Sequence, residues 1–292
     1  MAARTAALGA CDVWAHRTGS LDLRAPVIMA VLNTTPDSFS DGGRFTDPAA
    51  ALDRALEQVS EGAGIIDVGG ESTRPGADFV NEAEELARVV PIIRLLRLNL
   101  SVPISIDTRR AAVARACLDA GADIVNDVSA LADSEMASVV AAADAGLVLM
   151  HMQGEPRNMQ LNPRYADVVR EITDELEGRL NVAVEQGIAP GKVALDPGIG
   201  FGKTLEHNLE LIARLDVLAK LGQPVLLGVS RKAFLGKLIG GAEPESRAVA
   251  TAAACVVGLL KGARIFRVHD VRTVWEALQI GEAVRQASGA AS

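Results

Sequence analysis

The stretch Gly62-Ala63-Gly64-Ile65-Ile66-Asp67-Val68-Gly69-Gly70 shows the pattern that decides the fold. It follows a helical segment, opens with glycine and alanine, continues as a short apolar run and ends in polar and glycine residues. Similar openings stand at 121–125 (GADIV) and 262–266 (GARIF). In each case the glycine suits a helix C-cap and the alanine suits tight packing where a strand begins. The pattern therefore predicts the transition from a helix to a strand at three places.

Eight apolar runs of strand length recur along the chain. They are Val27–Leu32, Gly64–Val68, Val102–Ile106, Ala122–Val125, Leu147–Met150, Val193–Leu195, Val225–Leu227 and Arg264–Val268. Segments with helical periodicity lie between them, among them Pro48–Glu61, Asn81–Leu98, Arg109–Ala120, Tyr165–Gln186, Leu205–Leu221 and Glu245–Lys261. Continuous apolar runs suit parallel strands that are covered on both faces. The alternation predicts an α/β fold of the (β/α)8 TIM-barrel type; a doubly wound open sheet is the alternative.

The length and the lack of a linker favour a single domain. The chain has 292 residues, and a barrel of this type uses about 250. We expect residues 1–25 to form a leader with a hairpin at Trp14–Leu23 that closes the bottom of the barrel. The barrel is predicted to occupy residues 26–285, and residues 286–292 are predicted to be a frayed tail.

Composition narrows the classes of partner and compartment. The net charge of −8 argues against a nucleic-acid surface. The longest apolar run, Ala248–Leu260, is too short to span a membrane and is predicted to be a buried helix. The three cysteines, Cys11, Cys117 and Cys255, fit neither a zinc motif nor a disulfide framework, and the last two are predicted to be buried. A cytoplasmic protein without a secretory signal is expected.

Polar side chains stand at or near the ends of the predicted strands. They are Asn33, Asp67, Asp107, Asn126, Asp127, His151, Asp196, Ser230, Arg231, Lys232, Arg267 and His269. In a barrel the carboxyl ends of all strands meet at one face, where active sites of this fold lie. The alternative is that each of these residues caps the following helix. Eight coincident strand ends favour the first interpretation.

The chemistry of these residues divides the predicted mouth into two halves. Carboxylate and amide groups of Asp107, Asn126 and Asp196 suit a flat heterocycle rich in N–H groups. The cations Lys232 and Arg267, with His269 and Arg74, suit a phosphate. The residues alone therefore indicate a heterocycle that carries a phosphate ester.

Two long loops follow the first two predicted strands. They span residues 33–43 and 69–76 and are rich in glycine, proline and small polar residues. Such loops are solvated turns or lids over a site. Phe39 and Arg74 favour the lid, because a simple turn needs neither side chain.

Eight ordered segments carry a resemblance to a known family. They are NTTPDSFSDGG (33–43), VGGESTRPG (68–76), SIDT (105–108), NDVSA (126–130), LMHMQGEPRNMQ (149–160), LDPGIGFGK (195–203), VSRKAFLG (229–236) and RVHD (267–270). From about Leu21 to Ala283 the chain resembles bacterial dihydropteroate synthase. The resemblance implies a TIM barrel, a homodimer formed by late helices, Mg2+ and sulfonamide sensitivity. It also implies that (7,8-dihydropterin-6-yl)methyl diphosphate and p-aminobenzoate give 7,8-dihydropteroate and pyrophosphate.

The resemblance also implies roles for individual residues. The pterin diphosphate would be bound by Thr73, Asp107, Asn126, Met150, Asp196, Phe201, Gly228, Lys232, Arg267 and His269, and Asn33 would hold Mg2+. The p-aminobenzoate side and its loops would comprise Phe39, Asp41, Thr73, Arg74, Pro75, Phe201 and Ser230. Lys232, Arg267, His269, Asp107 and Asp196 would carry the chemistry. Ala30 and Thr34 stand where many members have glycine and valine, which bears on local packing and not on chemistry.

The expected mechanism needs no nucleophilic side chain. Pyrophosphate would leave first, its charge spread over Mg2+, Arg267 and His269, and the amine would then attack the pterin methylene. Direct displacement is the alternative order. Two rival functions remain: a corrinoid-dependent pterin methyltransferase, which has no need for residues 230–232 and 267–269 to grip pyrophosphate, and a paralogue that binds pterin without turnover. The complete loops at 33–43 and 69–76 argue against the paralogue.

Overall fold

The chain folds into a barrel of eight parallel strands. This computed structural model describes residues 12–34, 47–71, 80–155 and 158–289. The strands are β3 (Val27–Asn33), β4 (Ala63–Gly69), β5 (Ile104–Asp107), β6 (Ile124–Asp127), β7 (Gly146–Met150), β8 (Val193–Asp196), β9 (Leu226–Leu227) and β10 (Ile265–Val268). They pair in the order β8-β7-β6-β5-β4-β3-β10-β9, and a parallel bridge between Leu195 and Val225 closes the ring. The predicted TIM barrel is confirmed, and all eight predicted strands are present.

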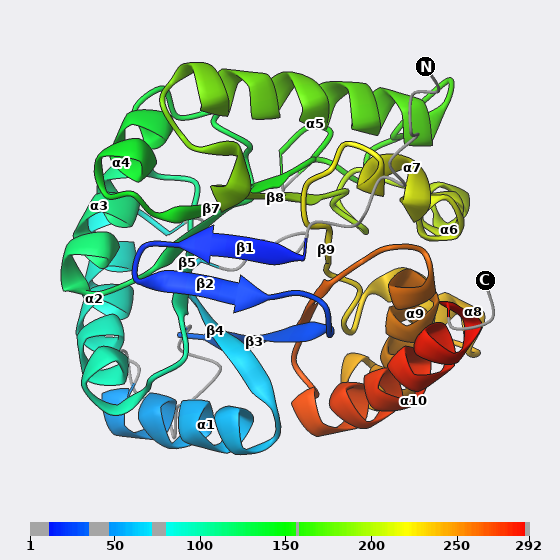
Figure 1. Cartoon of the computed structure of the whole chain (residues 1–292), viewed down its shortest axis with the longest axis horizontal. Coiled ribbons are helices and arrows are strands. Elements are labelled where there is room, and N and C mark those ends of the chain that lie inside the picture. The colour runs from blue at the N-terminus through cyan, green and yellow to red at the C-terminus, as the bar shows by residue number, and fades with distance from the viewer. Residues whose placement is uncertain (1–11, 35–46, 72–79, 156–157, 290–292) are drawn as a thin grey trace, which may run out of the picture.

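Helices surround the strands (Figure 1). They are α1 (Pro48–Ser60), α2 (Glu82–Asn99), α3 (Ala111–Ala120), α4 (Met136–Ala142), α5 (Val168–Glu185), α6 (Leu205–Ala213), α7 (Leu215–Ala219), α8 (Ala233–Leu238), α9 (Ala248–Leu260) and α10 (Val271–Gly289). The single helix predicted over Leu205–Leu221 is wrong, because Arg214 leaves the helical conformation and separates α6 from α7. The segment predicted from Glu245 begins as a 3-10 turn, Pro244–Arg247, before α9.

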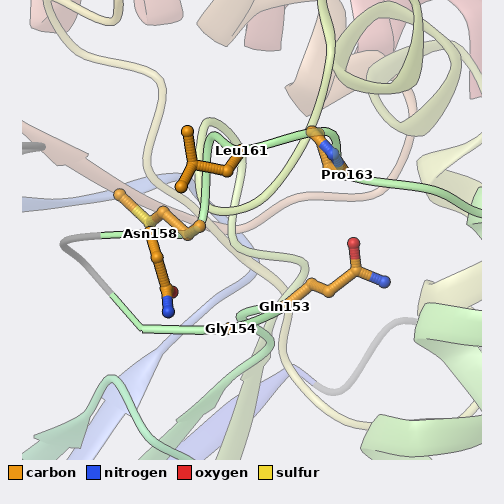
Figure 2. Close-up of a pocket in the computed structure, with 6 residues that line it drawn as sticks. Gln153, Gly154, Asn158, Leu161 and Pro163 are labelled. Atoms are coloured by element: carbon orange, nitrogen blue, oxygen red, sulfur yellow. The ribbon is translucent and has the colours of Figure 1, made fainter.

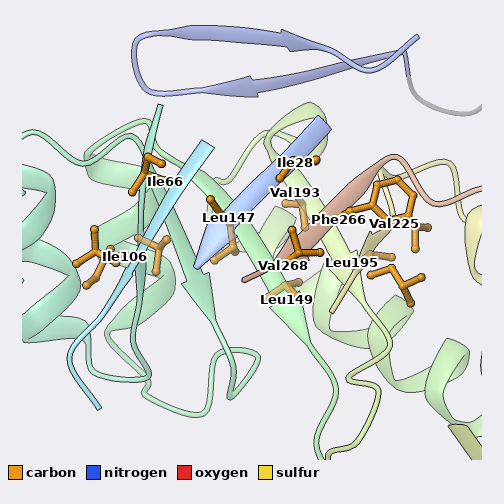
Figure 3. Packing of buried hydrophobic residues seen from close by; sticks show 14 of the residues in the cluster. Ile28, Ile66, Ile106, Leu147, Leu149, Val193, Leu195, Val225, Phe266 and Val268 are labelled. Atoms are coloured by element: carbon orange, nitrogen blue, oxygen red, sulfur yellow. The ribbon is translucent and has the colours of Figure 1, made fainter. Parts of the chain in front are cut away.

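The three glycine-alanine pairs explain how a helix ends and the next strand begins. Gly62, Gly121 and Gly262 have φ values of 109°, 113° and 106°, a left-handed conformation that favours glycine at a helix end. The alanines that follow them are buried. The strand residues that face outward, among them Ile66, Leu147 and Phe266, form the core between the barrel and its helices (Figure 3). The predicted burial of Cys117 and Cys255 is confirmed, whereas Cys11 lies outside the described residues.

An antiparallel hairpin covers the amino-terminal end of the barrel. Its strands are β1 (Val13–His16) and β2 (Gly19–Asp22), and it lies across one end of the parallel strands (Figures 1 and 3). Trp14 and Leu23, both fully buried, pack on the apolar residues inside the barrel. The indole N–H of Trp14 donates to the carbonyl oxygen of Lys192 at 2.9 Å. This arrangement fills the bottom of the barrel and leaves the other end for a site.

The last helix runs further than the sequence indicates. α10 continues to Gly289, and Gln286 donates to Glu282 within it. Residues 286–289 belong to this helix and residues 290–292 lie outside the described residues, so the frayed tail at 286–292 stays a prediction. Within the described part of the chain, no helix is both long and apolar enough to cross a membrane.

Candidate active site

A buried charge cluster lies at the carboxyl ends of the strands. The guanidinium of Arg267 on β10 donates from Nε to Asp67 Oδ2 at 2.7 Å and from Nη2 to Asp107 Oδ2 at 2.6 Å. Asn126 Nδ2 also donates to Asp67 Oδ2, at 3.2 Å. Three strands far apart in the sequence thus place Asp107, Asn126 and Arg267 together, as predicted. Asp67, which had no predicted role, links them.

Asp107 lies next to a space that glycine leaves open. A Cβ atom at Gly69 would lie 3.8 Å from both Asn33 Oδ1 and Asp107 Oδ2. Asn33, the last residue of β3, is therefore near the cluster. Burial, reinforced by Asp67 and opposed by Arg267, raises the pKa of Asp107 to about 7. Thr34, one of the two departures from the family pattern, donates from its backbone N–H and its hydroxyl to the carbonyl of Gly69.

Asp196 forms a second buried carboxylate on the same face. Its Oδ1 accepts from the backbone N–H of Gly198 at 2.7 Å, and burial raises its pKa to about 6. A Cβ at Gly228 would lie 3.6 Å from Asp196 Oδ2 and 4.0 Å from the Cβ of Arg267. Asp196, Gly228 and Arg267 are therefore neighbours at the mouth of the barrel.

An apolar patch adjoins these polar groups. Met150 and Phe201 pack with Val128 and Met159, and the ammonium of Lys232 lies 3.8 Å from the centroid of the Phe201 ring. The cation is thereby held over an aromatic face. Nearby, a pocket of about 290 Å³ is lined by Gln153, Gly154, Asn158, Met159, Leu161 and Pro163 (Figure 2). Met150, Phe201 and Lys232 are thus brought together as predicted.

Ser230 and His269 are paired on neighbouring loops. The Ser230 hydroxyl oxygen accepts from the backbone N–H of His269 at 3.2 Å and lies 3.0 Å from its Nδ1. Arg231, between Ser230 and Lys232, has a φ of 58° and forms a two-pronged ion pair with Asp270. The expectation that Arg231 grips pyrophosphate is therefore not supported. Its guanidinium instead ties the loop after β9 to the loop after β10.

Lys203 is a site residue that sequence reasoning missed. It is 3% exposed, and its ammonium group contacts His151 Nδ1 at 3.0 Å and the Phe201 carbonyl at 2.9 Å. Burial lowers the pKa of Lys203 to about 7 and that of His151 to about 3. The pair therefore fixes the loop that carries Asp196 and Phe201. The only sequence clue was that Lys203 ends the segment LDPGIGFGK. His207, the third residue of α6, forms a capping box with Thr204.

Five predicted residues cannot be placed. Phe39, Asp41, Thr73, Arg74 and Pro75 lie outside the described residues. The residues that flank the second loop are nevertheless anchored. Arg110 bonds to the carboxylates of Glu71 and Glu85, and its Nη2 donates to the carbonyl of Val80 at 2.6 Å.

Comparison with known proteins agrees with this fold. The family described as "Pterin binding enzyme" matches residues 29–269. A dihydropteroate synthase from Neisseria meningitidis serogroup C is 46% identical over 276 residues, which cover 93% of this chain and 97% of that protein. The Yersinia pestis dihydropteroate synthase, solved with a sulfonamide drug complex, superposes with a TM-score of 0.89 at 43% identity, covering 94% and 99% of the two chains. The Xanthomonas albilineans enzyme, solved with 7,8-dihydropteroate, gives 0.83 at 40% identity, covering 91% and 96%.

The barrel and its carboxylate-amide mouth define a pterin-binding enzyme of the TIM-barrel class. At this identity and coverage, the chain belongs to the dihydropteroate synthase family. It is therefore an enzyme, and its class is that of the transferases.

Proposed function

We propose that the mouth of this barrel condenses (7,8-dihydropterin-6-yl)methyl diphosphate with p-aminobenzoate to give 7,8-dihydropteroate and pyrophosphate. The observation that carries the proposal is the set of buried Asp107, Asn126 and Asp196 with the partly buried Arg267, which stand at the carboxyl ends of four strands. Carboxylates and an amide match the N–H groups of a pterin, and the buried setting strengthens each bond.

The proposed residue roles are those that the resemblance to the family implies. Asp107, Asn126 and Asp196 would bind the pterin edge, while Met150, Phe201 and Gly228 shape its slot. Lys232 would bind the pterin diphosphate, and Arg267 would stack on the ring. Arg267 and His269 would also take up charge on the leaving pyrophosphate. Thr73, Arg74, Pro75, Phe39, Asp41 and Ser230 are proposed for the p-aminobenzoate side, where sulfonamides are expected to compete.

Asn33 is the proposed protein ligand of Mg2+. The described residues hold no cluster of three or more His, Cys, Asp or Glu side chains that could bind a metal by itself. One amide oxygen beside an open space fits an ion that is bound largely by phosphate and water, which is the usual manner of Mg2+. When bound, the ion would neutralise charge on the diphosphate.

The proposed order is departure of pyrophosphate before attack by the amine. Asp107 and Asp196 are buried carboxylates on the pterin side, so their negative charge stabilises positive charge that develops on the pterin methylene. Direct displacement requires the amine in the rate-limiting step. Positional-isotope scrambling in the diphosphate without amine supports early departure. The absence of scrambling, together with a strict dependence of the rate on amine basicity, contradicts it.

Release of pyrophosphate tests the function itself. We expect release that requires both pterin diphosphate and p-aminobenzoate, and a loss of about 10²-fold or more in Lys232→Ala. A protein that binds pterin without releasing pyrophosphate would be the non-catalytic paralogue. Methyl transfer from a methylated pterin to a corrinoid, without pyrophosphate release, would identify the methyltransferase instead.

A homodimer through the late helices is also proposed. α9 and α10 pack side by side (Figure 1), and they expose Val249, Leu260 and Ile280 at 77%, 51% and 70%. Contiguous exposed apolar surface often marks an interface. Light scattering should give twice the mass of the chain, and Ile280→Arg should shift the mass toward one chain. An unchanged monomer in both proteins would contradict the proposal.

A further inference from the structure

Asp67 is the fully buried member of the charge cluster at the mouth of the barrel. It stands on β4 with no exposed surface, whereas the Arg267 side chain keeps 21% of its exposure. The inward positions on either side of Asp67 along β4 are Ile65, in the closed apolar end, and Gly69, at the open space. Asp67 is thus at the boundary between the packed end of the barrel and its mouth.

Two donors converge on one oxygen of this carboxylate. Arg267 Nε donates to Asp67 Oδ2 at 2.7 Å, and Asn126 Nδ2 donates to the same atom at 3.2 Å. The second bond turns the nitrogen of the Asn126 amide toward Asp67, so the carbonyl oxygen points away from it. The first bond, with that from Nη2 to Asp107, fixes the plane of the guanidinium. One buried group therefore sets the orientation of two proposed ligand-binding side chains.

The arrangement is costly for stability. Asp67 Oδ1 and Ser105 Oγ, at register-paired positions of β4 and β5, are buried and have no hydrogen-bond partner within the described part of the chain. A buried ion pair with an unsatisfied oxygen is often no more stable than apolar residues of the same volume. Such a cost is expected where a site must be oriented.

We propose that Asp67 is a positioning residue for the reaction, which acts by holding Arg267 and Asn126 in the orientation that receives the pterin diphosphate. The proposal rests on the roles proposed above for these two residues. Asp67 has no exposed surface and its carboxylate is bonded to Arg267 and Asn126, so its effect is transmitted through these two partners. The second substrate does not depend on it.

The test uses Asp67→Asn, which keeps the size of the side chain and removes its charge. We expect kcat to fall about 10²-fold, affinity for the pterin diphosphate by calorimetry to fall about tenfold, and KM for p-aminobenzoate to stay within about twofold. Asp67→Ser replaces this variant if it does not fold. The matched control is Asp123→Asn, because Asp123 is an equally buried aspartate that pairs with Arg97 at the closed end. It should lower the unfolding temperature and leave kcat unchanged.

A mutant cycle separates positioning from a general structural effect. If Asp67 acts through Arg267 and Asn126, adding Asp67→Asn to a variant that carries both Arg267→Lys and Asn126→Ala should cost little beyond the loss in that variant alone. Losses that multiply would overturn the proposal, as would a parallel rise in KM for p-aminobenzoate or an equal loss in Asp123→Asn. Wild-type turnover is measured first, so an error in the assigned reaction appears in the wild type and not in the cycle.

Discussion

The two ends of the barrel are formed by the same strands, but the inward side chains are apolar at one end and polar or charged at the other. Moving two residues along a strand, from the closed end to the mouth, changes the inward side chain. The step runs from Ile65 to Asp67 on β4, from Ile124 to Asn126 on β6, from Ala194 to Asp196 on β8 and from Ile265 to Arg267 on β10. Since side chains of a strand alternate between faces, each pair points into the barrel. A step of two residues along each strand therefore separates the apolar layer that stabilises the fold from the polar layer that is proposed to bind substrate.

The difference teaches which substitutions should affect stability and which should affect turnover. At the closed end, burial of Trp14, Leu23 and the inner apolar layer stabilises the fold by roughly 25 cal/mol for each Å² removed from water. At the mouth, buried carboxylates lose hydration that their partners only partly replace. Stability of the fold is therefore expected to depend mainly on the apolar layer at the closed end, and turnover mainly on the polar layer at the mouth.

The largest expected effect comes from comparing two arginines near opposite ends of β10. Arg267→Ala should lower kcat about 10³-fold, or about 4 kcal/mol, because it removes a cation beside the leaving group. Arg264→Ala is the control, since Arg264 is buried at the closed end and donates to the carbonyls of Leu259 and Ala263. It should lower stability without changing kcat. Equal loss of turnover in both variants would show that the two layers are not separate.

The second comparison concerns Trp14, the buried indole that fills the closed end of the barrel. Trp14→Ala should lower the free energy of unfolding by about 3–5 kcal/mol, because a fully buried indole leaves a cavity. Its kcat per folded molecule should remain that of the wild type. Val13→Ala, a change at a neighbouring residue that is 50% exposed, should alter stability by less than about 0.5 kcal/mol. Urea unfolding and active-site titration measure the two quantities.

The smallest expected effect is a pH dependence confined to the mouth. Burial is the main cause that raises the pKa of Asp107 to about 7 and that of Asp196 to about 6, against the opposing effect of the cations Arg267 and Lys232. Only the ionised groups accept two N–H donors, so affinity for a pterin without diphosphate should fall about tenfold from pH 8 to pH 6. Calorimetry with this ligand excludes titration of the phosphate. A flat profile from pH 8 to pH 5.5 would contradict the assignment.

The same shifts act on stability with the opposite sign. A carboxyl whose folded pKa lies above its unfolded value holds its proton longer in the folded state. The contribution to stability is therefore present below about pH 4 and is lost as the pH rises through about 6 to 7. Activity at the mouth and stability from its carboxylates should change in opposite directions over this range.

Much of the fold could be predicted because the repeated unit is local. The opening at Gly62 and Ala63, and its counterparts at 121 and 262, contains a helix end, a strand start and a polar strand end within a few residues. The convergence of Asp107, Asn126 and Arg267 follows from the barrel geometry alone. The break between α6 and α7 could not be predicted, because it depends on the conformation of the single residue Arg214.

The internal partners of the site were beyond the sequence for a similar reason. Asp67 was visible as an acid inside an apolar strand, but nothing local shows that Arg267, 200 residues away, donates to it. Lys203 gave even less indication, since lysine is rarely buried and its contact with His151 is formed by two loops. The chemistry of the residues predicts which side chains face a ligand. It does not predict which side chains, distant in the sequence, bond to one another.

The closure of the ring has a consequence for how the slot can change width. β8 and β9 meet only through the bridge between Leu195 and Val225, whereas the other neighbouring strands of the barrel form ladders. Asp196 ends β8 and Gly228 follows β9, so they stand on opposite sides of this bridge. Local opening requires the least free energy where the fewest backbone hydrogen bonds must break. The seam of the barrel is thus also its most compliant line, and it runs beneath the space where the heterocycle is expected to sit.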